Sequence, residues 1–269
     1  MGTPTTDIKI AALDRVAALT WRGTEEEPLG RWLLRAADGF TGRANSVLTS
    51  GDPGMPLPEA AARIRAWYTA RGLAPMASVS YPLGQPDRGP VDEFFAAQGW
   101  RLRDEAEVIV MTQQAAAVPP QPAPLPVRFD DQPSDSWLAL YHFRGQPDLP
   151  PIARTILTSA PWQAFASIRD GDRTVAIGRV ATAKDGAEPS AEPNAEHWAS
   201  LTAIEVDPEY RRRGLAAAVT TALIAHAAQR GAGRVFLQVE DGNQPALALY
   251  RRLGFTEHHG YHYRVAPAR

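Results

Sequence analysis

The feature that most constrains the fold of this chain is a pattern repeated at an interval of 155 residues. Asp52-Pro53 lies 155 residues before Asp207-Pro208, and Gly99-Trp100 lies 155 residues before Gly254-Phe255. Between these landmarks, both halves show the same order of strand, helix, strand, short helix and strand. In the N-terminal half these elements are predicted at 44–49, 58–71, 76–80, 91–98 and 106–111. The repeat predicts two α/β folds of one kind in tandem.

A proline-rich segment marks the boundary between the two halves. Residues 114–126 contain five prolines and no charged residue, a composition that cannot build a core and favours extended geometry. We therefore predict an N-terminal domain at 1–113, a linker at 114–126 and a C-terminal domain at 127–269. In the C-terminal domain, buried strands predicted at 198–206 and 234–239 flank a helix. This order predicts a mixed α/β sheet in which those two strands are parallel neighbours joined by a helical crossover.

Composition narrows the functional class. The formal net charge is −2, which argues against a nucleic-acid or anionic-membrane partner, because such partners favour a strongly basic face. The chain has no cysteine, so disulfides, thiolate metal sites and a cysteine nucleophile are excluded. No run approaches the ~18 apolar residues of a membrane span, and residues 1–10 lack the apolar core of a signal peptide. We expect a cytoplasmic protein.

One loop has the composition of an anion site. The sequence Arg211-Arg212-Arg213-Gly214-Leu215-Ala216 follows a predicted strand and opens a predicted helix. A helix N-terminus presents unpaired backbone N–H groups and about half an elementary positive charge, and arginines add bidentate donors for phosphate oxygens. The loop therefore predicts a pyrophosphate site. It differs from the P-loop, because no Gly-Lys-Ser/Thr follows, and from the dinucleotide fingerprint, because it has a single glycine.

A second segment downstream makes this prediction specific. It has the pattern Asn-x-x-Ala-x-x-x-Tyr-x-x-x-Gly-Phe, beginning at Asn243. Together the two segments resemble the signature of the GNAT superfamily, the Gcn5-related N-acetyltransferases. The residues that match the signature are Arg211, Gly214, Ala216, Asn243, Ala246, Tyr250, Gly254 and Phe255. The resemblance covers residues 127–269, and the N-terminal half repeats the fold in degenerate form.

The resemblance implies where a cosubstrate binds. In that family the two central parallel strands separate at their C-terminal ends, and acetyl-CoA lies between them without a metal. The backbone at the end of the first strand would bind the acetyl group and pantetheine arm, and the loop N–H groups would hold the pyrophosphate. The residues expected to bind acetyl-CoA are Ile204, Glu205, Val206, Arg211, Arg212, Arg213, Gly214, Leu215, Ala216, Ala217, Asn243, Ala246 and Tyr250.

The resemblance also implies the chemistry. An acceptor amine attacks the thioester carbonyl directly, without an acyl-enzyme, and backbone N–H groups of the first strand stabilise the developing oxyanion. Tyr250 matches the family tyrosine that protonates the departing thiolate. A phenol, with an ordinary pKa of about 10, can supply that proton if it is placed against the sulfur.

The general base is the position at which this chain departs from the family. Ser200 and Gln238 stand where a glutamate is common, and neither takes a proton at neutral pH. Glu240 shares the face of Gln238 by strand alternation, so Glu240 is the expected base. His197 or an ordered water is an alternative. Alternation places Glu205 on the face opposite Ser200, which argues against the Glu205 side chain as the base.

The N-terminal half lacks the chemistry of the loop. Residues 56–61, Pro-Leu-Pro-Glu-Ala-Ala, stand in the place of the arginine-glycine loop. Prolines remove N–H donors, and the charge of Glu59 repels phosphate. Arg88 and Phe95 replace the asparagine and tyrosine of the second segment. We therefore expect that the N-terminal domain does not bind acetyl-CoA and serves to close the acceptor pocket.

The sequence thus predicts an N-acetyltransferase that moves an acetyl group from acetyl-CoA to the primary amine of a small molecule or peptide. Two alternatives stay open. Because the usual base is missing, the chain could be a non-catalytic acyl-CoA sensor or scaffold. The tandem arrangement with an active C-terminal half also resembles mycothiol synthase, which acetylates a cysteinyl amine.

Overall fold

The computed structural model describes residues 4–85, 87–103, 107–117, 125–141, 148–184 and 197–268. Residues 118–124 of the predicted linker lie outside this part of the chain, as does residue 106 of a predicted strand. Contacts between residues divide the chain into two compact units. Unit 1 comprises Met1–Val110, Val239–Asn243 and Glu257–Arg269, and unit 2 comprises Met111–Gln238 and Gln244–Thr256.

The N-terminal elements follow the order predicted from the repeat. They are α1 (Pro4–Thr20), β1 (Glu25–Leu29), β2 (Trp32–Ala36), η1 (Arg43–Asn45), β3 (Val47–Leu48), α2 (Leu57–Thr69), β4 (Met76–Tyr81), α3 (Pro90–Ala97), β5 (Arg101–Leu102) and β6 (Val108–Gln114). Helix α1 and strand β1 were not predicted, because the N-terminus has no regular apolar spacing. Helix α1 and strand β1 form the beginning of the N-terminal fold, for which the repeat pattern in the sequence gives no prediction.

In unit 1, β1 and β2 form an antiparallel hairpin, β2 pairs with β3, and β3 is parallel to β4. Strand β12 (Thr256–Val265) lies antiparallel to β4 on its other side, with Tyr261 opposite Ser80. Helices α2 and α3 pack aromatic side chains onto this sheet. The core includes Trp32, Val47, Ile64, Tyr68, Val79, Phe95 and Trp100, all buried.

The second half of the chain also follows the predicted order of elements. Its elements are η2 (Ala115–Ala117), β7 (Val127–Asp130), α4 (Asp135–Leu140), α5 (Ile152–Leu157), β8 (Trp162–Asp170), β9 (Arg173–Lys184), β10 (His197–Val206), η4 (Pro208–Tyr210), α6 (Leu215–Gln229), β11 (Arg234–Glu240), α7 (Gln244–Arg252) and β12. Strands β7 to β10 are successive antiparallel neighbours, and β10 is parallel to β11. The predicted helical crossover between β10 and β11 is confirmed as α6.

The two halves of the sequence exchange their last strands. Strand β12 ends the second half of the chain, yet it pairs with β4 and belongs to unit 1 from Glu257 onward. Strand β6 ends the first half, yet it neighbours β11, and its residues from Met111 onward belong to unit 2. Each unit is therefore completed by a strand from the other half of the sequence.

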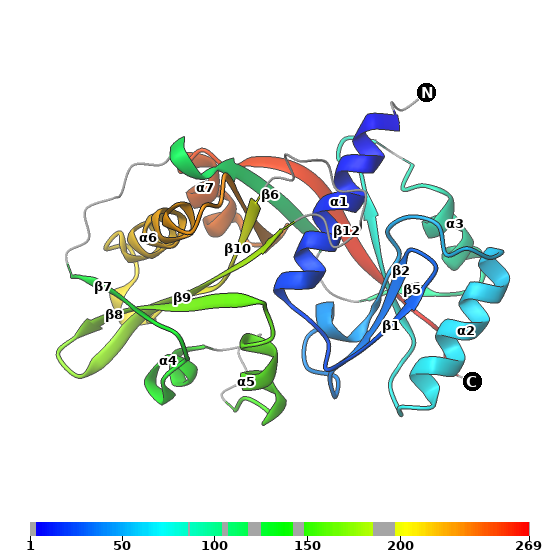
Figure 1. Ribbon diagram of the computed structural model, residues 1–269, viewed down its shortest axis with the longest axis horizontal. Coiled ribbons are helices and arrows are strands. Elements are labelled where there is room, and N and C mark those ends of the chain that lie inside the picture. Colours follow the sequence, from blue (N-terminus) through cyan, green and yellow to red (C-terminus); the bar gives the residue numbers. More distant parts are fainter. Residues whose placement is uncertain are drawn as a thin grey trace. The chain divides into compact units, whose positions relative to one another are not determined.

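Helices cover both faces of the unit 2 strands. A Cβ on Gly178 in β9 would lie 2.6 Å from Val219 and 2.8 Å from Leu223, so α6 packs directly on that face. The neighbouring residue Arg179 points to the other face, because side chains alternate along a strand. Its Nε donates to the carbonyl of Leu157 at the end of α5. Figure 1 shows α6 on one side of β8–β10, with α4 and α5 on the other. No helix within the described residues is long and apolar enough to cross a membrane.

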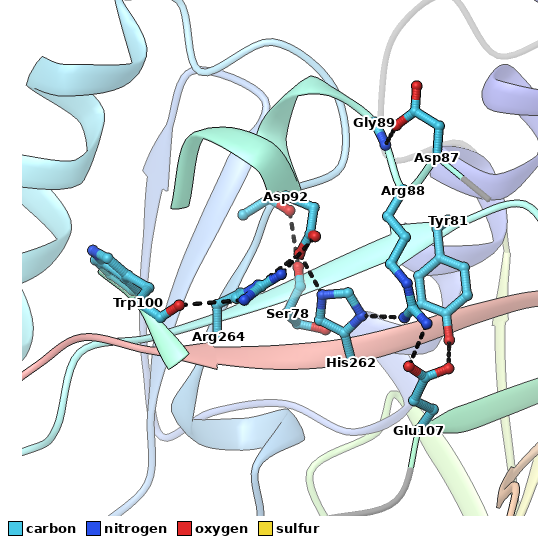
Figure 2. Close-up of polar contacts among 11 residues, drawn as sticks. Ser78, Tyr81, Asp87, Arg88, Gly89, Asp92, Trp100, Glu107, His262 and Arg264 are labelled. Atoms are coloured by element: carbon cyan, nitrogen blue, oxygen red, sulfur yellow. Dashed lines mark hydrogen bonds and ion pairs between the residues drawn. The ribbon is translucent and has the colours of Figure 1, made fainter. Parts of the chain in front are cut away.

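A buried ionic cluster ties β12 to unit 1 (Figure 2). The Asp92 carboxylate, at the start of α3, accepts hydrogen bonds from Nε and Nη2 of Arg264 (2.8 and 2.7 Å) and from Nε2 of His262 (2.5 Å). Arg88 donates to the other ring nitrogen of His262 at 2.8 Å, so that nitrogen accepts and Nε2 carries the proton. Burial favours a higher pKa for Asp92, but the hydrogen bonds from Arg264 and His262 outweigh it and hold the pKa well below its ordinary value.

We predict that Asp92→Ala lowers the free energy of unfolding by about 3–5 kcal/mol, because it leaves Arg264 buried without its partner. Because the folded-state pKa of Asp92 is depressed, its contribution is present above pH ~4 and is lost as the pH falls further. The variant and the parent should therefore converge in stability in acid. Urea denaturation between pH 2 and pH 7 measures how far the difference between them narrows. Asp135→Asn, in an exposed pair with Arg154, is the control, with a change below about 1 kcal/mol. An equal loss in both variants would contradict the prediction.

Candidate functional site

The loop between β10 and α6 has the geometry of an anion-binding nest. Arg212 and Gly214 both adopt left-handed backbone conformations, with φ of 61° and 79°, which turns successive N–H groups toward one side. The first backbone bond of α6 runs from the Ala218 N–H to the Gly214 carbonyl at 3.0 Å. The N–H groups of residues 215–217 therefore have no acceptor within the helix. A Cβ on Gly214 would meet no protein atom within 4 Å, so the loop is open to a ligand.

Ion pairs fix the base of this loop. Arg173 from β9 binds Asp207 at 2.7 Å and Glu209 at 2.6 Å. The second oxygen of Asp207 accepts the backbone N–H of Glu209 at 3.0 Å, which caps the short helix η4. The Arg213 guanidinium lies 4.7 Å from the centre of the Tyr210 ring. Arg212 is exposed, and its side chain has no partner among the described residues. One arginine of the loop is therefore available to an anion.

The two parallel strands part from each other beside this loop. The ladder between β10 and β11 runs from Trp198 opposite Arg234 to Leu201 opposite Leu237, and stops there. Strand β10 continues to Val206, still paired with β9 on its other edge. The backbone of residues 204–206 therefore has no partner strand on the β11 side within the described ladder. This is the edge at which ligands enter parallel α/β sheets.

A β-bulge causes this separation and changes which way Glu205 points. The register between β10 and β9 shifts between Thr202 and Glu205, and Ala203 has a left-handed φ of 54°. Thr202 lies opposite Arg179 and Glu205 opposite Ile177, so Thr202 and Glu205 point to one face. The expectation that Glu205 faces away from Ser200 is therefore wrong. One extra residue in the strand reversed the alternation, and no glycine marks the bulge in the sequence.

Glu205 acts electrostatically on Tyr250. Tyr250 is buried in α7, with its ring 5.8 Å from that of Phe255. Burial and the nearby carboxylate of Glu205 raise the pKa of the Tyr250 phenol to about 12. The phenol is therefore protonated throughout the neutral range. Thus unit 2 brings together a buried phenol, a carboxylate and the open edge of β10.

The remaining predicted residues are divided between the two units. Glu240 is exposed at the end of β11, and its carbonyl accepts the N–H of Asn243 at 2.9 Å. Both residues belong to unit 1, whereas Tyr250 and Ala246 belong to unit 2. His197 begins β10 and lies near Gly231, at the end of the strand remote from Val206. At about 3.3 Å per residue, His197 lies about 20 Å along the strand from Ala203, which argues against His197 as the base.

Comparison with known proteins identifies structures of the same fold and relatives in sequence. A "GCN5-related N-acetyltransferase from Kribbella flavida" has the same fold, with a TM-score of 0.61 at 16% identity over 100% of this chain and 98% of that one. At this identity the likeness shows the fold of the GNAT type. The family model described as "Probable histone acetyltransferase Rv0428c C-terminal" matches residues 5–264, and the chain belongs to this family of N-acetyltransferases.

Two curated relatives match along nearly the whole chain. The chain is 31% identical to "Probable histone acetyltransferase Rv0428c" of Mycobacterium tuberculosis, over 98% of this chain and 76% of the relative. It is 27% identical to "Uncharacterized N-acetyltransferase YobR" of Bacillus subtilis, over 95% of this chain and 98% of the relative. The similarity therefore spans both halves of the repeat, including the half without the loop.

We predict that Gly214→Ala lowers the free energy of unfolding by about 1–2 kcal/mol, because a Cβ disfavours the left-handed backbone that this position requires. Gly233→Ala is the matched control. Gly233 has no positive φ, and a Cβ there also meets no atom within 4 Å, so its stability should stay the same or rise slightly. Urea denaturation compares the two. Equal stabilities would show that the loop does not depend on the left-handed turn.

Proposed function

We propose that the protein transfers the acetyl group of acetyl-CoA to a primary amine of a small molecule or peptide. The observation that carries the proposal is the nest at Arg212–Gly214 beside the open edge of β10. A CoA thioester has a pyrophosphate, which the nest can bind, and an amide-containing arm, which can hydrogen-bond to the unpaired backbone of a strand. The backbone of Ile204 to Val206 binds that arm, and the N–H groups of residues 215–217 bind the phosphates.

Tyr250 supplies the proton for the leaving group. The amine nitrogen attacks the thioester carbon, the C–S bond breaks, and the CoA sulfur leaves as a thiolate that must be protonated. An ordinary thiol has a pKa of about 8.5, so a phenol with a pKa of about 12 holds its proton until the thiolate forms. Proton transfer from the Tyr250 phenol to the CoA thiolate becomes more favourable if the pKa of the phenol falls during the reaction.

Glu205 is the general base in this proposal. It lies on the same face as Ser200 and Thr202, where a base is common in the family, and its charge acts on Tyr250. Taking a proton from the acceptor amine neutralises Glu205. The loss of that charge removes one of the two causes of the raised pKa of Tyr250. Deprotonation of the amine by Glu205 therefore makes Tyr250 a stronger acid for the leaving thiolate. Glu240 is the alternative base, and a non-catalytic sensor is the alternative function.

The start of α2, which stands in the place of the start of α6 in the repeat, lacks the nest, and this supports placing the transfer in the C-terminal half. Helix α2 begins after Pro56, and its N–H groups from Glu59 and Ala60 both donate to the Pro56 carbonyl at 3.0 and 3.1 Å. Pro58 has no N–H to offer. In the repeat, Glu59 stands in the place of Gly214. The start of α2 therefore presents few donors and an acidic side chain.

The proposed function is tested by thiol-specific detection of free CoA. The protein is mixed with acetyl-CoA and a panel of amines: amino acids, an aminoglycoside, a peptide N-terminus, a lysine peptide of histone sequence and a cysteinyl amine. We expect turnover on at least one amine, and loss of CoA binding in calorimetry for Gly214→Trp but not for the control Gly233→Trp. Tight CoA binding without turnover on any amine would support the sensor. Normal CoA binding by Gly214→Trp would overturn the site.

We predict that Glu205→Gln and Tyr250→Phe each lower kcat by about 10²–10⁴-fold, the usual contribution of a general base or acid. CoA affinity should change little, because neither change removes a phosphate contact. Glu240→Gln is the matched control and should keep kcat within about twofold of the parent, since that carboxylate is exposed. Steady-state kinetics on the best amine decides the outcome. Loss of activity in Glu240→Gln alone would return the role of base to Glu240.

A further inference from the structure

Unit 1 contains a polar cavity of its own, of about 390 Å³. It lies where the parallel strands β3 and β4 end, and α1 and the start of α3 complete its walls. Thr49, Ser50 and Gly51 follow β3. Ser80 is the last residue but one of β4, and Asp14 comes from α1. The volume is within the range of small-molecule sites, and the place is the one at which ligands bind parallel α/β sheets.

The repeat relates this cavity to the proposed acetyl-CoA site. At the interval of 155 residues, Thr49-Ser50-Gly51 stands in the place of Ile204-Glu205-Val206. Two further residues of the cavity, Gln85 and Arg88, stand in the place of Glu240 and Asn243. Unit 1 has thus kept a cavity at the end of its parallel strands while losing the phosphate nest. A ligand of this cavity has to be recognised by something other than a pyrophosphate.

Asp14 is the group that could recognise such a ligand. It is 5% exposed, and its carboxylate accepts hydrogen bonds from Ser50 Oγ (2.5 Å) and from Nε2 of His259 (3.2 Å). Burial favours a higher pKa for Asp14, but hydrogen bonds from His259, Ser50 and Ser80 lower it below its ordinary value. With these three donors, about one of the roughly four acceptor positions of the carboxylate is left for a donor in the cavity. The buried Ser80 Oγ accepts no hydrogen bond within the described part of the chain, so its lone pairs are also left for such a donor.

The charges around the cavity favour a cation. Asp14 and Asp87 contribute two carboxylates, and Asp87 also accepts the backbone N–H of Gly89 at 2.7 Å. The arginine of the cavity wall, Arg88, is already neutralised: it binds Glu107 at 2.5 Å and His262 at 2.8 Å, as Figure 2 shows. The guanidinium also lies 4.3 Å from the centre of the Tyr81 ring. The two carboxylates outnumber the one paired arginine, so the wall carries an excess of negative charge, which favours ligands of the opposite sign.

We propose that this cavity binds a small primary ammonium compound, whose –NH₃⁺ group pairs with Asp14 and hydrogen-bonds to Ser80. An ammonium has three donors and no acceptor, which matches the remaining acceptor position of the carboxylate and the lone pairs of the Ser80 hydroxyl. The site is independent of the proposed acetyl-CoA site, because all its lining residues belong to unit 1 and none to the nest.

The test is isothermal titration calorimetry on the full-length protein without CoA. The probes are ethanolamine, 1,5-diaminopentane and glucosamine, each with its uncharged match: ethylene glycol, 1,5-pentanediol and glucose. We expect at least one ammonium probe to bind with one-to-one stoichiometry and at least tenfold more tightly than its match. Asp14→Asn should lower that affinity by at least tenfold. Ala11→Phe, which fills the cavity without touching the ion pair of Asp14 and His259, should abolish binding while thermal unfolding stays unchanged.

Two controls separate this site from the nest. Asp135→Asn removes an exposed carboxylate elsewhere and should leave the affinity for the ammonium probe unchanged. Gly214→Trp should also leave it unchanged, even though that variant is expected to lose CoA. The proposal is overturned if no ammonium probe binds, if the uncharged match binds as tightly, or if folded Ala11→Phe binds the probe as the parent does. None of these outcomes depends on whether the protein acetylates an amine.

Discussion

The early end of the ladder between β10 and β11 is the constraint on which the functional half depends. The two strands pair through Leu201 and Leu237 and no further, because a bulge with Ala203 in a left-handed conformation turns β10 away. The bulge frees the backbone of residues 204–206 and turns Glu205 to the face of Thr202, and β10 ends shortly before the nest at Arg212–Gly214. A regular ladder would satisfy that backbone within the sheet and leave no room for a ligand. The cost of a left-handed alanine, about 1 kcal/mol or more, is offset by the pairing that β9 keeps on the other edge.

The internal repeat provides a comparison within one molecule. Both units have a pair of parallel strands joined by a helix, and both have polar groups at the ends of these strands. What differs is the start of the helix. In unit 2 a glycine with φ of 79° begins α6 and leaves N–H groups free; in unit 1 Pro56 and Pro58 begin α2 and the first donors turn back onto the Pro56 carbonyl. The same fold is therefore suited to an anion in one half and, with Asp14 in its cavity, to a cation in the other.

The exchange of terminal strands makes the N-terminal unit depend on residues from the C-terminal half of the chain. Strand β12 supplies His259, His262 and Arg264 to unit 1, although it follows the proposed catalytic tyrosine in sequence. Its side chains hold both Asp14 and Asp92 in ionised form. The N-terminal half supplies hydroxyl groups to Asp14, but the cationic or ring N–H partners of both carboxylates come from β12, and each buried charge left unpaired would cost several kcal/mol. This explains why the family match runs through both halves up to residue 264.

The sequence alone determined the class of fold, the repeat, the position of the nest and the family, because these depend on local signals: periodic apolar residues, a glycine after arginines, and motif spacing. It also placed Tyr250 and the order of nearly every strand and helix. The tertiary structure decided the rest. The direction of Glu205 depends on a bulge without a glycine, the partner of β12 on a strand more than 150 residues away in the chain, and the cavity at Asp14 on a helix that has no periodic signal. These features arise from long-range pairing and burial, whose energies no local pattern records.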